Sequence, residues 1–167
     1  RFVPVSVNLS WMDFYDENML EWIVRGLKKN NPNEQKIRFE ITETSLAAIG
    51  ENHTRMLMHL KENGAEILLD DFGNGYSSFG MLQDYDFDIL KIDISFVRNI
   101  GVNKKSESIL RAIIDMAHQL GIRLVAEGAE TEEQVAFLRA NGCEYIQGYY
   151  YYKPMPENEF LQLLDEG

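Results

Sequence analysis

The sequence predicts an α/β fold in which parallel strands alternate with helices. Six short strand-like runs recur along the 167 residues, and segments with helical periodicity lie between most of them. Three glycines supply further evidence, because Gly64, Gly121 and Gly142 each follow a helical run and suit the left-handed position that ends a helix. A strand begins shortly after each glycine, and such short loops are typical of α/β units.

The expected elements follow one another along the whole chain. Strands are expected at 2–8, 36–42, 65–70, 87–93, 122–127 and 144–148. Helices are expected at 17–29, 51–63, 106–120 and 132–141, with a last helix after Pro156. Thr131, with Gln134 three residues later, has the pattern of a capping box and places the start of the fourth helix.

Two architectures have a parallel sheet of this kind: an open doubly wound sheet and a closed barrel. No G-x-G-x-x-G motif follows the first strand, so a dinucleotide-binding fold has no support. A TIM-type (β/α)8 barrel has eight strands in about 250 residues. The six strands favour such a barrel, and we expect about two βα units to precede Arg1. Residues 1–167 then form one partial barrel domain.

The charge and composition exclude several functions. A net charge of −11 argues against binding to duplex nucleic acid or an anionic membrane, but not against a small anionic ligand held through divalent cations. No apolar stretch approaches the roughly 18 residues of a membrane span. The single cysteine, Cys143, excludes a disulfide framework, favours a reducing, cytoplasmic setting and is expected to be a small buried residue.

Polar side chains occur at the carboxyl end of all six expected strands. They are Asn8, Glu40 with Glu43 just beyond, Asp70 and Asp71, Lys91 and Asp93, Glu127 and Glu130, and Gln147. Any one of them alone would be interpreted as a helix cap, a turn former or a solvated residue. In a parallel barrel, however, these strand ends share the face where active sites lie. Because burial of unpaired carboxylates is costly, the cluster indicates that cations bind there.

The chemistry of the candidate ligands points to hard cations. All are oxygen donors, which suits Mg²⁺, Mn²⁺ or Ca²⁺, and the three histidines lie in or beside helical stretches. The adjacent Asp70 and Asp71 can share two ions, a standard arrangement for phosphoester hydrolysis. Lys91 could then orient the attacking water or stabilise charge on the phosphate.

Six motifs resemble, in order and spacing, those of the EAL-domain family. They are VSVNLS, FEITET, LLDDFGNGYSS, LKIDISFV, LVAEGAETEEQ and GCEYIQGYYYYKPMP, and together they run from about residue 2 to 165. Members of this family hydrolyse the bacterial second messenger cyclic di-GMP to linear pGpG. The resemblance implies a cytoplasmic phosphodiesterase domain, whose parent protein could be membrane-anchored and would carry GGDEF or sensory domains.

The resemblance also implies roles for individual residues. One metal would be bound by Asn8, Glu40 and Asp70, and a second, bridged by Asp70, by Asp71. Lys91 would position the attacking water, and Glu127 would lie near the second metal or that water.

Further residues would support the site or couple it to a partner. The side chains implied to lie around the substrate are Asp93, Glu130 and Gln147. Glu43 would anchor the mobile loop from Phe72 to Ser78, through which, together with the following helix, a homodimer would form. Mg²⁺ or Mn²⁺ would support the reaction, and Ca²⁺ would inhibit it because its looser geometry positions water poorly.

The chain also departs from the family pattern. The glutamate of the Glu-Ala-Leu strand is absent, because that strand would precede Arg1. Asn74 replaces the usual threonine, Ala129 the usual valine, and Ile94 a common basic residue. Tyr149 to Tyr152 would either stack on guanine or pack within the fold. Three alternatives therefore stay open: a non-catalytic cyclic di-GMP receptor, a fragment inactive without the missing glutamate, and a fragment whose open barrel edge is covered by a partner chain.

Overall fold

The six strands form one curled sheet with every neighbouring pair parallel. The computed structural model describes residues 3–10, 12–13, 17–30, 37–47, 52–73 and 78–166. The strands are β1 (Val5–Asn8), β2 (Ile37–Thr42), β3 (Glu66–Phe72), β4 (Ile89–Ile92), β5 (Arg123–Glu127) and β6 (Tyr145–Gln147). Their order in the sheet is their order in the chain. A doubly wound sheet reverses its order partway, so this order confirms the TIM-type arrangement.

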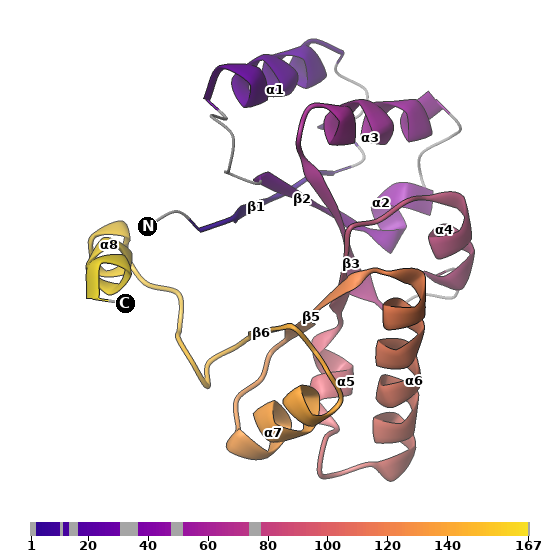
Figure 1. Cartoon of the computed structure of the whole chain (residues 1–167), viewed down its shortest axis with the longest axis vertical. Coiled ribbons are helices and arrows are strands. Elements are labelled where there is room, and N and C mark those ends of the chain that lie inside the picture. Colours follow the sequence, from indigo (N-terminus) through magenta and orange to yellow (C-terminus); the bar gives the residue numbers. More distant parts are fainter. Residues whose placement is uncertain are drawn as a thin grey trace.

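Eight helices are described, and the five expected ones are among them. They are α1 (Glu17–Asn30), α2 (Glu43–Ala47), α3 (Asn52–Glu62), α4 (Ser78–Asp84), α5 (Ile94–Arg98), α6 (Lys104–Leu120), α7 (Glu132–Ala140) and α8 (Glu157–Glu166). The sequence analysis missed α2, α4 and α5, because helices of one or two turns are too short to show a helical period. Figure 1 shows α1, α3, α4 and α6 outside the curled sheet.

The two faces of the sheet bury different residues, because side chains alternate along a strand. The outer face packs on the helices in one large core, to which the strands contribute Phe39, Ile41, Ile67, Leu69, Leu90, Ile92, Leu124 and Ala126. On the inner face a second, small core consists of Leu68, Ile89 and Val125. Polar side chains surround this small core on the inner face: Glu40 pairs in register with Leu68, and Lys91 with Val125.

The predicted helix ends are confirmed. Thr131 and Gln134 form both hydrogen bonds of a capping box at the start of α7. The backbone φ angles of Gly64, Gly121 and Gly142 are 89°, 71° and 86°, in the left-handed region that favours glycine. Cys143 is buried, as expected, with 7% of its surface exposed.

Strand β3 contains an irregularity at the point where its two aspartates lie. Leu69 pairs with Leu90 and Phe72 with Ile92, so β3 has one residue more than β4 between these pairs. Asp71 accommodates the insertion. Its φ is 57°, a left-handed conformation that aspartate tolerates better than most residues do. The bulge interrupts the regular alternation of side chains between Asp70 and Asp71.

Some sequence predictions fall outside the described residues. These are the ends of three expected elements, at residues 2, 36 and 51, and the centre of the expected mobile loop, residues 74–77. In the part of the chain that the structure describes, no helix has the length and apolar character of a membrane-spanning segment.

Candidate active site

Lys91 on β4 is the centre of a cluster of carboxylates at the carboxyl end of the sheet. Its Nζ lies 3.0 Å from Glu40 Oε2 on β2 and 3.3 Å from both carboxylate oxygens of Asp70 on β3. On the other side, Glu127 Oε2 on β5 lies 3.4 Å away. All four side chains project from the inner face of the sheet, so four strands bring together residues that are far apart in the sequence.

The charges of this cluster are coupled. Burial by itself lowers the pKa of Lys91, but attraction by Asp70, Glu40 and Glu127 outweighs it and raises that pKa above its usual range. For Asp70 the balance is opposite, because burial raises its pKa more than the nearby ammonium lowers it. The Lys91 ammonium therefore stays protonated at neutral pH and presents a fixed positive charge.

The charges around Asp71 are mostly negative, and the Lys91 ammonium offsets only part of their effect on its pKa. Burial raises its pKa, and repulsion from Asp70 and then Asp93 raises it further. Asp70 Oδ1 accepts a hydrogen bond from the Asp71 backbone N–H at 2.8 Å. Asp93 caps helix α5, where its Oδ1 accepts from the Ser95 N–H at 2.8 Å. The bulge of β3 thus places two neighbouring aspartates at one site with an excess of negative charge.

The remaining predicted site residues lie around this cluster. Asn8 is exposed at the end of β1 and pairs in register with Glu40. At the opposite edge of the sheet, Gln147 on β6 pairs in register with Glu127 on β5. Glu130 is exposed in the loop after β5. Glu43, at the start of α2, is buried, and its Oε1 accepts from the Gly73 N–H at 3.0 Å, which ties α2 to the end of β3.

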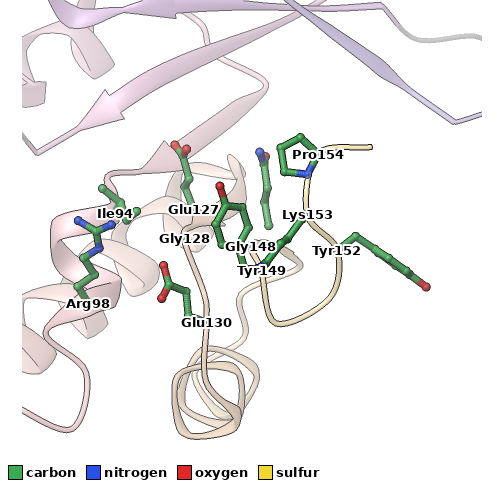
Figure 2. Close-up of a pocket in the computed structure, with 11 residues that line it drawn as sticks. Ile94, Arg98, Glu127, Gly128, Glu130, Gly148, Tyr149, Tyr152, Lys153 and Pro154 are labelled. Atoms are coloured by element: carbon green, nitrogen blue, oxygen red, sulfur yellow. The ribbon is translucent and has the colours of Figure 1, made fainter. Parts of the chain in front are cut away.

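A pocket of about 360 Å³ opens beside Glu127. Its lining comes from α5, from the end of β5 with the loop after it, and from the end of β6 with the segment after it: Ile94, Arg98, Glu127, Gly128, Glu130, Gln147, Gly148, Tyr149, Tyr152, Lys153 and Pro154. Figure 2 shows Arg98 and Glu130 extending from different elements on the same side of the pocket, whereas the Tyr152 ring extends away. The sequence analysis gave Arg98 and Lys153 no role. Arg98 follows Ile94 by four residues, one helical turn, but this spacing has a meaning only once the short helix α5 is recognised.

Comparison with known proteins assigns the family. The family model for the EAL domain matches residues 1–154 of this chain.

The chain belongs to the EAL domain family.

Known EAL domain proteins resemble the chain in sequence and in fold. The Pseudomonas aeruginosa protein named cyclic di-GMP phosphodiesterase NbdA is 42% identical over 120 residues, which cover 72% of this chain and 15% of NbdA. The EAL domain of Mycobacterium smegmatis DcpA superposes with a TM-score of 0.89 at 32% identity, covering 99% of this chain and 74% of that one.

A third comparison links this fold to a ligand. Klebsiella pneumoniae BlrP1, solved as a manganese and cyclic di-GMP complex, matches with a TM-score of 0.78 at 29% identity, over 86% of this chain and 37% of that one. The chain spans about a fifth of the length of the first curated relatives that it matches.

The candidate ligands of this EAL domain are of the chemical type that hard divalent cations prefer. Every candidate ligand is a carboxylate or amide oxygen, and the carboxylates outnumber the single ammonium of Lys91. Among the described residues, no three His, Cys, Asp or Glu side chains are already arranged to hold an ion by themselves. The Lys91 ammonium lies between the carboxylates and offsets part of their repulsion.

Proposed function

We propose that this EAL domain is a metal-dependent phosphodiesterase that hydrolyses cyclic di-GMP to linear pGpG. The observation that carries the proposal is the Lys91 ammonium, held within 3.4 Å of carboxylates from three other strands at the carboxyl end of the sheet. A buried, fixed cation beside surplus carboxylates suits a reaction in which negative charge grows on a phosphate. The names of the relatives support the same activity.

The residues divide into those that would hold ions and those that would act on the substrate. The ligands of two Mg²⁺ or Mn²⁺ ions would be Asn8, Glu40, Asp70, Asp71 and Glu127. Such ions, when bound, withdraw charge from the phosphodiester and make water a better nucleophile at neutral pH. Lys91 Nζ donates hydrogen bonds that hold the attacking water or a phosphate oxygen in place.

The reaction is an in-line displacement at phosphorus. The bond from the water oxygen to phosphorus forms as the bond from phosphorus to the ribose 3′-oxygen breaks. The water loses a proton, and the leaving 3′-oxygen gains one, which leaves a linear dinucleotide with a 5′-phosphate. Glu127 is half-buried and lines the pocket, so its carboxylate is open to this water on one side. Asp93, Glu130 and Gln147 would lie around the bound substrate.

The test is hydrolysis of cyclic di-GMP by the full-length protein and by its Asp70→Asn variant, with Mg²⁺ or Mn²⁺. We expect the wild type to release pGpG and the variant to lose turnover, because the amide removes a charged ligand but keeps the shape. Ca²⁺ in place of Mg²⁺ is expected to abolish turnover. Near-wild-type turnover by Asp70→Asn would contradict the scheme. Binding of cyclic di-GMP without any turnover by the wild type would instead identify a receptor.

We also propose a homodimer formed through the loop after Asp71 and helix α4. Phe79 on α4 supports this, because 68% of its surface is exposed while its ring contacts Phe72 edge to face, with centroids 5.7 Å apart. The hydrogen bond from Gly73 to Glu43 ties the start of this loop to the site. Sedimentation of the wild type and of Phe79→Glu tests the proposal. A dimer is expected only in the wild type, and equal masses would contradict it.

A further inference from the structure

Arg98 is the last residue of α5, and its side chain lines the pocket. It is exposed and lines the cavity, and no hydrogen bond or ion pair joins its side chain to another residue of the described part of the chain. The helix that carries Arg98 is nevertheless held in place by packing. Ile94, one turn earlier, covers Gly128 so closely that a Cβ at Gly128 would overlap the Ile94 side chain. Helix α5 is therefore held against the loop that follows Glu127.

The pocket is adjacent to the Lys91 cluster. Glu127 belongs to both, since its carboxylate lies 3.4 Å from Lys91 Nζ and it also lines the cavity. A substrate whose phosphodiester lies at Lys91 therefore places a neighbouring nucleoside in the pocket. Tyr149, with 57% of its surface exposed, contributes an aromatic ring to the lining, and Lys153 Nζ lies 5.5 Å from the centre of that ring.

The charges of the lining favour a neutral base over a second phosphate. Two cations, Arg98 and Lys153, are matched by two carboxylates, Glu127 and Glu130, so the pocket carries no net positive charge. A second phosphate would gain little there, because repulsion by the two carboxylates offsets its attraction to the two cations. A base that carries both acceptors and donors on its edges can use both kinds of group.

We propose that Arg98 is a specificity-determining residue that recognises a guanine base, with its guanidinium donating to O6 and N7. Arginine forms a bidentate pair with these two acceptors, whereas adenine presents an amino donor in place of O6 and faces the guanidinium with like polarity. This inference deepens the proposed function and rests on it, because it names the base that is selected at the same site.

The experiment compares kcat/KM for cyclic di-GMP and cyclic di-AMP in the full-length protein. Arg98→Ala is expected to lower the preference for cyclic di-GMP by about 10-fold or more, mainly through KM for the guanine substrate. Arg98→Lys keeps the charge without the planar fork and is expected to lose most of the same preference. Arg25→Ala is the matched control, because Arg25 forms only an exposed pair with Glu21 on α1 and should leave the preference unchanged.

The outcomes separate this inference from the proposed function. Equal losses for both substrates would mean that Arg98 acts on phosphate or through general charge, and the inference would be overturned. An unchanged preference in Arg98→Ala would overturn it too. If the wild type hydrolyses neither substrate, the proposed function fails, and calorimetry with GMP and AMP decides the inference alone. Binding of GMP only, lost in Arg98→Ala, would support it, and equal or absent binding of the two nucleotides would overturn it.

Discussion

The Lys91 ammonium lies 3.0 Å from the Glu40 carboxylate, although the two residues are 51 positions apart in the chain. Strand β3 lies between their strands, so the contact crosses a neighbour on the inner face of the curled sheet. A flat sheet would hold next-nearest strands about 10 Å apart. The curvature that begins a barrel therefore helps to bring Lys91 to Glu40, whereas Asp70 and Glu127 lie on the strands directly beside β4.

Replacing Lys91 by methionine is expected to reduce turnover of cyclic di-GMP by about 100-fold or more. The methionine fills a similar volume but cannot donate to the water or the phosphate, and loss of such a preorganised group typically has an effect of this size. Steady-state kinetics on the full-length protein check the prediction. Lys104→Met, at the exposed start of α6, is the control and should keep wild-type rates. Equal activity of the two variants would show that Lys91 takes no part in the reaction.

Glu66→Gln is expected to lower the free energy of unfolding by about 2–4 kcal/mol. Glu66 is buried at the other end of β3, where Oε2 accepts from Arg38 Nε at 3.0 Å and Oε1 from an Arg123 NH2 group at 2.8 Å. The amide cannot accept from both arginines, and the partial exposure of Arg123 limits the loss. Urea denaturation measures it. Glu21→Gln breaks an exposed pair and should change stability by less than about 0.5 kcal/mol. A similar small change in Glu66→Gln would mean that the buried bridge adds no net stability.

Gly128→Ala is expected to destabilise the domain by about 1–3 kcal/mol and to disturb the pocket. Gly128 has a φ of 79°, and an added Cβ would overlap Ile94. Ile94→Ala in the same chain should restore only part of the loss, since it removes the overlap but not the backbone strain. Thermal denaturation of both single variants and the double variant tests this. Gly26→Ala is the control, because a Cβ there meets nothing within 4 Å. Full rescue in the double variant would show that backbone strain contributes nothing.

Cys143 is expected to make stability depend on pH above neutrality. Burial raises the pKa of its thiol from the usual 9.0 to about 11. The folded state holds this proton more tightly than the unfolded state, so the stabilisation is complete below pH 9 and is lost as the pH rises towards 11. The slope attributable to this group reaches about 1.4 kcal/mol per pH unit. Denaturation of the wild type and of Cys143→Ala between pH 8 and 10.5 measures the difference. Parallel curves for the two proteins would show that the thiol does not titrate with folding.

The local pattern of the sequence was sufficient for the order of the elements. Alternating strand-like and helical runs, with glycines after helices and a capping box at Thr131, indicated the six strands and the five longer helices that the structure contains. The sequence also named the polar residue at the end of each strand. These features could be predicted because they depend on neighbours within a few residues, through side-chain periodicity and the conformational freedom of glycine.

Only the tertiary structure decided how the polar residues meet. The bulge at Asp70 and Asp71 arises from the pairing of β3 with β4. The central position of Lys91 depends on side chains from four strands. Arg98 enters the site through α5, a helix of five residues that shows no period in the sequence. Each of these relationships joins residues that are distant in the chain, or rests on backbone geometry imposed by a neighbouring strand. The sequence by itself therefore determined which residues are available for chemistry, and the curled sheet determined which of them act together.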